Sequence, residues 1–333
     1  MPAWEPVIGL EVHVHLKTRS KIFCRCENRF GADPNTLVCP ICLGYPGTLP
    51  LLNGAAVDLA AALALALGCE VAPLSVFARK NYFYADLPKG YQISQFDRPL
   101  AERGVLPLTE HPRSIRIHRL HLEEDAGKLL HDWPGGGALG DVSLVDFNRC
   151  GVPLVEIVSE PEIRSAAEAE DYLRSLHQLL MFTGASDGNM EEGSLRCDAN
   201  ISIKRSEETQ LGTKVEVKNL NSFKNVARAV EHEIARQSAL LDQGQTVAQE
   251  TRGFDADSGR TKSLRGKEAA HDYRYFPEPD LPVLHLSAAR LAGLRSALPE
   301  MPWIRRARLA DTFGLSPAEA RDLVAVRGLA DYF

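Results

Sequence analysis

The chain has 333 residues, of which 44% are hydrophobic and 25% are charged, values ordinary for a globular protein large enough for two domains. Its net charge of −6 excludes a general nucleic-acid coat, so any contact with RNA must be local. The longest apolar stretch, 55–68, contains Asp58 and is too short to span a bilayer, and residues 1–9 lack the pattern of a signal peptide. We therefore expect a cytoplasmic protein without a membrane partner.

An alternating segment near the amino terminus, residues 8–16, predicts a β-strand. Its apolar residues share one face, and Glu11, His13 and His15 share the other. Side chains on one face of a strand lie roughly 6.5–7 Å apart, so two of them can flank one cation. A carboxylate and an imidazole are reasonable ligands for a divalent ion, although a solvent-facing strand would show the same pattern.

Two cysteine pairs follow, Cys24 with Cys26 and Cys39 with Cys42, separated by twelve residues. Four thiolates from two short knuckles are what a closed tetrahedral zinc site requires, with no position left open for a substrate. The total of seven cysteines, an odd number, fits a reducing compartment better than a disulfide scaffold. We expect a structural zinc that fastens the loop around 31–35, with free or redox-active cysteines as the alternative.

Residues 79–95 are unusually dense in aromatic, basic and amide side chains. Such a mixture can stack on bases and neutralise phosphates, or it can form an aromatic minicore under a Pro-Gly loop. A second aromatic segment, rich in proline, lies at 272–280.

Three consecutive carboxylates, residues 123–125, end another apolar-alternating run. Adjacent carboxylates repel one another, so the run indicates either a charged hairpin tip or a bound cation. Two later segments, 196–203 and 213–218, alternate in the same way and put Asp198 and Glu216 on their polar faces. Several such faces that converge would make an acidic, hydrated Mg²⁺ site, whereas each alone is more often an exposed sheet face.

Capping signals predict the helices. Long helices are expected at 53–67, 165–183 and 221–243, and strand signals vanish after 286, where helices are expected at 287–298, 303–313 and 316–327. We place a domain boundary near residue 290. The glycine-rich stretch 134–137 lacks the arrangement of a P-loop, and the basic stretch 251–267 is expected to be a mobile loop or a phosphate contact.

Seven motifs lie in order over nearly the whole chain: IGLEVH at 8–13, RKNYFY at 79–84, KGYQISQ at 89–95, LEEDAGK at 122–128, MEEGSLRCDAN at 190–200, VKNLNSF at 217–223 and DYRYFPEP at 272–279. Together they resemble those of the B subunit of the aspartyl/glutamyl-tRNA amidotransferases. The resemblance implies an α+β fold in which residues 1–290 form a cradle-like catalytic domain, built on a mostly antiparallel sheet with flanking helices.

The same resemblance implies that residues 291–333 begin a helical domain. Members of the family continue well past residue 333, through the rest of that domain and a small tail domain. We therefore expect a truncated chain that lacks the tail domain and has a weakened grip on the body of the tRNA.

Site residues are also implied by the resemblance. It assigns Mg²⁺ in a kinase-like site to Glu11, His13, Glu124, Asp198 and Glu216, and zinc to Cys24, Cys26, Cys39 and Cys42.

The reaction that the resemblance implies is the conversion of Glu-tRNA(Gln) to Gln-tRNA(Gln) and of Asp-tRNA(Asn) to Asn-tRNA(Asn). A side-chain carboxylate is a poor electrophile, so ATP first turns it into an acyl phosphate, and Mg²⁺ screens the repulsion between the two anions. Candidates for contacts with phosphate or the terminal nucleotide are Lys80, Lys89 and Lys128, and candidates for stacking on the tRNA 3′ end are Tyr82, Tyr84 and Tyr91.

Ammonia must then reach the acyl phosphate by an enclosed path, because in bulk water ammonia is mostly ammonium and the acyl phosphate hydrolyses. The sequence shows no glutaminase nucleophile with a base partner, since Cys69, Cys150 and Cys197 lack a recognisable context. The family takes ammonia from an amidase-like A subunit, which a small C subunit braces, so we expect an obligate assembly. The rival interpretations are a non-catalytic tRNA-binding scaffold and a zinc hydrolase, which a closed four-cysteine site disfavours.

Overall fold

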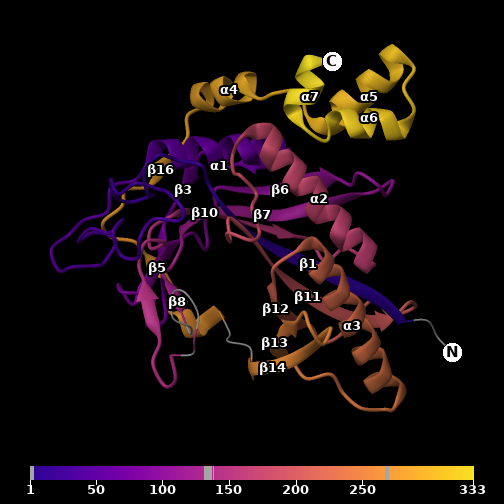
Figure 1. Cartoon of the computed structure of the whole chain (residues 1–333), viewed down its shortest axis with the longest axis horizontal. Coiled ribbons are helices and arrows are strands. Elements are labelled where there is room, and N and C mark those ends of the chain that lie inside the picture. Colours follow the sequence, from indigo (N-terminus) through magenta and orange to yellow (C-terminus); the bar gives the residue numbers. More distant parts are fainter. Residues whose placement is uncertain (1–3, 131–136, 138, 267–269) are drawn as a thin grey trace.

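The computed structural model describes residues 4–130, 137, 139–266 and 270–333. Within them, a nine-stranded sheet carries three long helices on one face, and shorter helices lie at one end of the molecule (Figure 1). No helix in the described part of the chain is both long and apolar enough to cross a bilayer.

The large sheet is antiparallel except where β12 and β13 run parallel. Its strands are ordered β14 (Arg260–Gly266), β13 (Glu250–Asp255), β12 (Val215–Leu220), β11 (Leu195–Arg205), β1 (Trp4–His15), β10 (Pro153–Ser159), β7 (Ser114–Glu124), β6 (Ala101–Pro107) and β2 (Glu70–Val71). The expected mostly antiparallel sheet with flanking helices is therefore confirmed.

Three small sheets surround the large one. They pair β15 (Phe276–Pro277), β4 (Ala78–Asn81) and β5 (Tyr91–Ser94); β16 (Leu284–His285) and β3 (Leu74–Ser75); and β8 (Lys128–Leu130) and β9 (Leu144–Asp146).

The central strand β1 shows why the sheet has one apolar and one polar face. Ile8, Leu10 and Val12 are completely buried against the helices, as the alternation predicted. Burying each such side chain contributes about 1.5–3 kcal/mol, so a one-residue shift that turned this face to water would be strongly unfavourable. The same alternation turns the polar residues of β1, Glu11 and His13 among them, away from the helices.

The three long helices begin and end where the capping signals predicted. They are α1 (Gly54–Ala66), α2 (Ala166–Thr183) and α3 (Phe223–Asp242). Asn53, Ser165 and Ser222 each accept a backbone N–H of the first turn with their side chains. Gly184, at φ 68°, ends α2 in the left-handed conformation that glycine adopts without strain.

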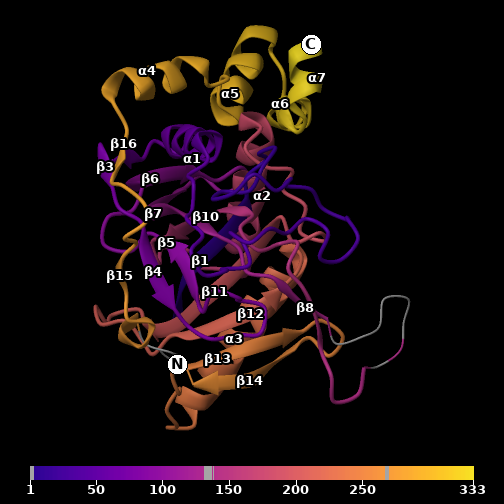
Figure 2. The ribbon, with the colours of Figure 1, turned by 90° about the vertical axis from the view of Figure 1, so that its left-hand side faces the viewer.

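The carboxyl-terminal part is helical, as expected. It contains α4 (Ala288–Ala297), α5 (Pro302–Phe313), α6 (Pro317–Val324) and α7 (Arg327–Tyr332), which Figures 1 and 2 show in yellow beyond α1 and α2. Leu309 and Val324 pack with Phe182 from α2 in a small apolar cluster of their own. The helix expected at 316–327 is interrupted, because Val326 is extended and separates α6 from α7.

The basic stretch 251–267, for which a mobile loop was one expectation, is not a loop. Up to residue 266 it belongs to the antiparallel pair β13–β14, in which Arg252 donates from Nη2 to the Thr261 carbonyl at 2.9 Å. Its backbone hydrogen bonds come from neighbouring strands, which the polar composition does not reveal. Lys267 and residues 134–136 of the glycine-rich stretch lie outside the described residues.

Candidate functional site

The polar face of the sheet, opposite the three long helices, is hollowed by a cavity of about 1250 Å³. Strands β1, β7, β11 and β12 contribute to its lining, together with residues 28–32, 34, 187 and 190–194. We call this the large cavity. Its volume is sufficient for a nucleotide and the end of a second substrate.

Three potential metal ligands meet in the middle of this face. His13 on β1 lies opposite Glu156 on β10, and Glu123 comes from β7 on the other side of β10. The His13 Nε2 atom is 3.3 Å from Glu156 Oε2 and 3.8 Å from Glu123 Oε1, and one ligand atom from each residue lies within 4.8 Å of the others. We call this group the histidine–carboxylate cluster. One imidazole and two carboxylates can hold a divalent cation.

The electrostatics of the cluster favour a bound positive charge. Burial lowers the pKa of His13, but its hydrogen bond to Glu156 and the charges of Glu156 and Glu123 outweigh this and raise it to about 9. Burial likewise raises the pKa of Glu156, yet the neighbouring His121 and His13 hold it well below its usual range. The described residues therefore favour one positive charge at this place: a proton on the imidazole or, in its stead, a divalent ion, because a protonated imidazole has no lone pair to bind a metal.

A second acidic group lies beside the cluster. Glu11 on β1 is directly opposite Asp198 on β11, and burial together with neighbouring carboxylates raises the pKa of Glu11. Lys218 Nζ lies 2.6 Å from Asp198 Oδ2 and 3.7 Å from Glu216 Oε1. Four of the five expected Mg²⁺ ligands thus share the polar face, and the ammonium of Lys218 compensates part of the charge of two of them.

Glu124, the fifth expected ligand, is separated from the other four, which corrects the sequence-based grouping. Its Oε1 atom accepts the backbone N–H of Ile93 at 2.9 Å and forms an ion pair with Lys89. The physical reason is the period of two: Glu124 is in phase with the buried Leu120 and Leu122, so it points to the opposite face of β7.

The place that we expected for Glu124 is occupied by Glu123. Sequence reasoning also missed Glu156 and His121. The Oε2 atom of Glu156 lies 3.5 Å from the Nε2 atom of His121. The phase of β7 was a usable signal for Glu123. No local pattern identifies Glu156, a single carboxylate in an apolar strand.

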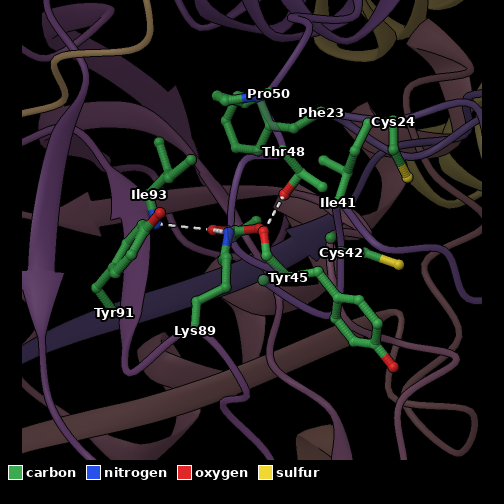
Figure 3. Close-up of a pocket in the computed structure, with 13 residues that line it drawn as sticks. Phe23, Cys24, Ile41, Cys42, Tyr45, Thr48, Pro50, Lys89, Tyr91 and Ile93 are labelled. Carbon is green, nitrogen blue, oxygen red and sulfur yellow. Dashed lines mark hydrogen bonds and ion pairs between the residues drawn. The ribbon is translucent and has the colours of Figure 1, made fainter.

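Glu124 lies in a separate, smaller cavity of about 60 Å³, whose walls include Phe23, Tyr91 and Ile93 (Figure 3). We call this the small cavity. The close-up shows Lys89 beside Tyr91, and Cys24 and Cys42 at the other end of the same pocket. The ammonium of Lys89 lies 5.2 Å from the Tyr91 ring centroid, so both residues face this cavity.

The structure therefore divides the expected nucleotide and tRNA contacts between the two cavities. Lys80, Tyr82 and Lys128 line the large cavity, whereas Lys89 and Tyr91 line the small one.

The aromatic stretch is partly the minicore that we considered as the alternative. Tyr82 is edge-on to both Tyr84 and Tyr273, at centroid distances of 5.9 and 6.2 Å. Its hydroxyl donates to Gln92 Oε1 at 3.3 Å, which fixes the ring further. Tyr84 is 48% exposed and is not among the residues of either cavity lining.

Asp125, the last carboxylate of the run, gathers cationic groups at the large cavity. Its Oδ2 atom lies 2.6 Å from His15 Nε2, 2.7 Å from Arg196 Nη2 and 3.5 Å from Arg149 Nε. Burial raises its pKa, but the two guanidinium groups hold the pKa well below its usual range. One carboxylate cannot neutralise two guanidinium groups, so this wall of the cavity is suited to an anion.

The four clustered cysteines come together as the spacing predicted. One sulfur from each of Cys24, Cys26, Cys39 and Cys42 lies within 4.8 Å of the others. The sulfurs of Cys39 and Cys42 are 3.8 Å apart, the separation expected in a tetrahedron with Zn–S bonds of about 2.3 Å. We call them the cysteine quartet. It could hold a structural zinc ion.

A fully buried lysine supports a negatively charged quartet. The Nζ atom of Lys21 lies 3.8 Å from the sulfur of Cys42 and donates to the Leu37 carbonyl at 2.7 Å. A hydrogen bond with Cys24 and the charge of Lys21 lower the pKa of Cys42 to about 5, against the effect of burial. A buried ammonium needs a nearby anion, which thiolates would provide.

The chain is similar to known proteins over nearly its whole length. The family described as the GatB/GatE catalytic domain matches residues 6–292. The B subunit of the aspartyl/glutamyl-tRNA(Asn/Gln) amidotransferase of Myxococcus xanthus (strain DK1622) is 54% identical over 332 residues, which cover 99% of this chain and 68% of the relative. The protein of the same name from Geobacter sulfurreducens is 55% identical over 333 residues, covering 99% and 69% of the two chains.

A third relative of that name, from Nitratidesulfovibrio vulgaris (strain DP4), is 54% identical and covers 100% of this chain and 69% of its own length. The family match spans well over half of the chain, and it contains both cavities, the histidine–carboxylate cluster and the cysteine quartet. The resemblance found in the motifs is thereby confirmed, and the chain belongs to the family of aspartyl/glutamyl-tRNA(Asn/Gln) amidotransferase B subunits.

Proposed function

We propose that this chain activates the side-chain carboxylate of Glu-tRNA(Gln), of Asp-tRNA(Asn) or of both, at the expense of ATP, for amidation by ammonia. The observation that carries the proposal is the histidine–carboxylate cluster, of which His13 and Glu123 line the large cavity. The transamidation of misacylated tRNA is inferred from the family, and the cluster is the proposed place of the phosphoryl transfer.

The residues present fit a divalent ion. His13, Glu123 and Glu156 would hold Mg²⁺, which would screen the repulsion between the substrate carboxylate and the γ-phosphate. Glu123 takes the place that the sequence assigned to Glu124, while Glu11, Asp198 and Glu216 border the ion. Lys218, bound to Asp198, compensates one of these negative charges and leaves the others for a cation.

The cationic wall around Asp125 would bind the polyphosphate. Arg196 and Arg149 line the large cavity, and Arg149 is held by the carbonyl of Ala126, 3.0 Å from its Nε. Guanidinium groups held in this way can donate paired hydrogen bonds to phosphate oxygens without losing much side-chain entropy. Lys80 and Lys128 would add charge on the same side, as we expected from the sequence.

Ammonia would come from a partner. Of the cysteines outside the quartet, Cys69 and Cys150 are buried, and burial raises the pKa of each thiol to about 12. Such thiols stay protonated and are poor nucleophiles, so neither suits a glutaminase. We propose the amidase-like A subunit as the source of ammonia and the small C subunit as the third member of the assembly.

We further propose that the cysteine quartet binds zinc as a structural element, and that residues 1–290 form the cradle-like catalytic domain while 291–333 begin the helical domain. None of the seven cysteines is in a disulfide, which supports a cytoplasmic location. Metal analysis of the purified chain is expected to find one zinc ion per molecule. Its absence would remove the zinc assignment without affecting the proposed reaction.

The proposed reaction is tested with the assembled three subunits, Glu-tRNA(Gln) or Asp-tRNA(Asn), ammonium chloride, ATP and Mg²⁺. We expect ATP hydrolysis and amidated tRNA to appear together and to require Mg²⁺. A scaffold without catalytic activity would bind tRNA and consume no ATP. That outcome would contradict the proposal, because ammonium chloride removes any dependence on the glutaminase.

A further inference from the structure

The loop between the two cysteine pairs, residues 27–38, is fixed at both its base and its tip. At the base, the quartet joins its two ends. At the tip, Asn35 adopts φ 60°, donates from Nδ2 to the Val145 carbonyl at 3.0 Å and accepts the Phe147 N–H at 2.8 Å with its Oδ1. Asn148 donates to the Asp33 carbonyl at 2.7 Å. We call residues 27–38 the quartet loop.

The quartet loop forms one wall of the large cavity. Residues 28–32 and 34 line it, and Figures 1 and 2 show the indigo amino-terminal loops on the same side of the molecule as β8. Phe30 in this wall is 64% exposed. Among the described residues no other aromatic ring is paired with it, and Phe30 belongs to the lining of the cavity.

Basic side chains accompany Phe30. Arg29, Lys17, Lys128 and Arg149 line the same cavity, and Lys128 on β8 is paired with Asp146 on β9. The carboxylate of Asp146 is occupied by backbone N–H groups of the quartet loop and of residue 148. Acidic residues such as Glu191 and Glu192 also line this cavity, and Arg29 is paired with Glu27. In a chain with a net charge of −6, an exposed ring and several cations on the walls of one cavity suit the end of a single-stranded nucleic acid.

Tyr82, which we expected to stack on the tRNA from sequence alone, is less suitable. Its ring is in contact with Tyr84 and Tyr273, and its hydroxyl is bound to Gln92. A ring that is already packed in this way offers a base less free surface than Phe30 does.

We propose that the quartet loop presents Phe30 as the stacking platform for the terminal base of the tRNA 3′ end. The inference rests on the proposed function, which requires that this end enter the large cavity. It also gives the cysteine quartet a use: the metal would keep Phe30 rigid, so that little entropy is lost when the base stacks. Stacking of one base on an aromatic side chain contributes about 1–3 kcal/mol.

The test uses the assembled three-subunit enzyme and a tRNA that carries 2-aminopurine at its 3′-terminal position. Stacking quenches the fluorescence of this base, so binding to the wild-type enzyme is expected to quench it. Phe30→Ala should abolish the quenching and raise the KM for aminoacyl-tRNA about 5- to 150-fold, with little change in kcat. Phe30→Trp should restore both.

Phe83→Ala is the matched control. Phe83 is 78% exposed, more than Phe30, and does not belong to the lining of either cavity. Quenching that persists in Phe30→Ala, or that is lost equally in Phe83→Ala, would overturn the inference. The proposed function is assessed separately by ATP-dependent amidation in the wild type, so the two failures are distinguishable.

Discussion

The two cavities differ in the groups that surround the carboxylate each receives from β7. The large cavity, of about 1250 Å³, contains Glu123 among imidazoles and a second buried carboxylate. The small cavity, of about 60 Å³, contains Glu124 already neutralised by Lys89 and walled by aromatic and aliphatic side chains. Neighbouring residues of one strand thus enter opposite environments. The first remains available to a cation, and the second is satisfied within the protein.

The buried carboxylates of the two cavities are also compensated in different ways. Glu123 and Glu156 lie together and depend on His13 and His121 for compensation, so a ligand can change the balance. Glu124 has a lysine and a backbone N–H, and its charge is compensated without a ligand. Substitutions in the large cavity should therefore affect catalysis first, and substitutions in the small cavity should affect stability.

The largest effect is expected for Glu123→Gln. The change keeps the size of the side chain but removes the charge that would hold the metal. Transamidation should therefore fall by more than about 100-fold, the upper end of the loss for groups that only support a metal ligand. Initial rates of amidated tRNA formation measure this. Glu160→Gln, at a partly exposed glutamate paired with His118, is the control and should stay near the wild-type rate. Equal activity in both variants would remove the metal role from Glu123.

Next in size is the stability loss expected for Lys89→Met. It would leave the Glu124 carboxylate buried without its cation, which costs about 3–5 kcal/mol. Urea unfolding of the single variant and of Lys89→Met/Glu124→Gln measures the coupling. The double variant should recover much of the loss, because the uncompensated charge is gone. A double variant no more stable than the single one would contradict the assigned pairing.

A smaller effect is expected for Asp125→Asn. The amide no longer attracts Arg196 and Arg149, so these groups should become less ordered and the KM for ATP should rise about tenfold, or about 1.4 kcal/mol. The kcat should change less than KM. A loss confined to kcat, with unchanged KM for ATP, would argue against the polyphosphate assignment of this wall.

The smallest effect is expected for Tyr82→Phe. Its hydroxyl makes one long hydrogen bond of 3.3 Å to Gln92, and such a neutral bond contributes about 0.5–1.5 kcal/mol. We expect less than a threefold change in the KM for aminoacyl-tRNA. A change as large as that of Phe30→Ala would mean that the Tyr82 hydroxyl takes part in binding the aminoacyl-tRNA.

Much of the architecture could be predicted from local patterns. The alternation in residues 8–16 identified β1 and its two faces, and Asn53, Ser165 and Ser222 marked the starts of the three long helices. The cysteine spacing predicted the quartet. These features are local because backbone geometry sets the period of a strand or helix, and a cap needs only neighbouring residues.

The grouping of the carboxylates could not be predicted in the same way. Three adjacent acidic residues were interpreted as one charged site, but they point to three environments: the histidine–carboxylate cluster, the small cavity, and the guanidinium groups of Arg149 and Arg196. The phase of β7 alone would have separated Glu123 from Glu124. The destination of Asp125, beyond the end of the strand, depends on residues far away in the chain.

The sequence by itself determined which residues could share a strand face, where the long helices begin, that four cysteines lie together, and the family. Only the tertiary structure decided that β10 lies between β1 and β7, and therefore that Glu156 joins His13 and Glu123. It also decided that residues 250–266 pair as strands at the edge of the sheet. The physical reason is that alternation is a property of the local backbone, whereas strand neighbours and register depend on contacts between distant segments.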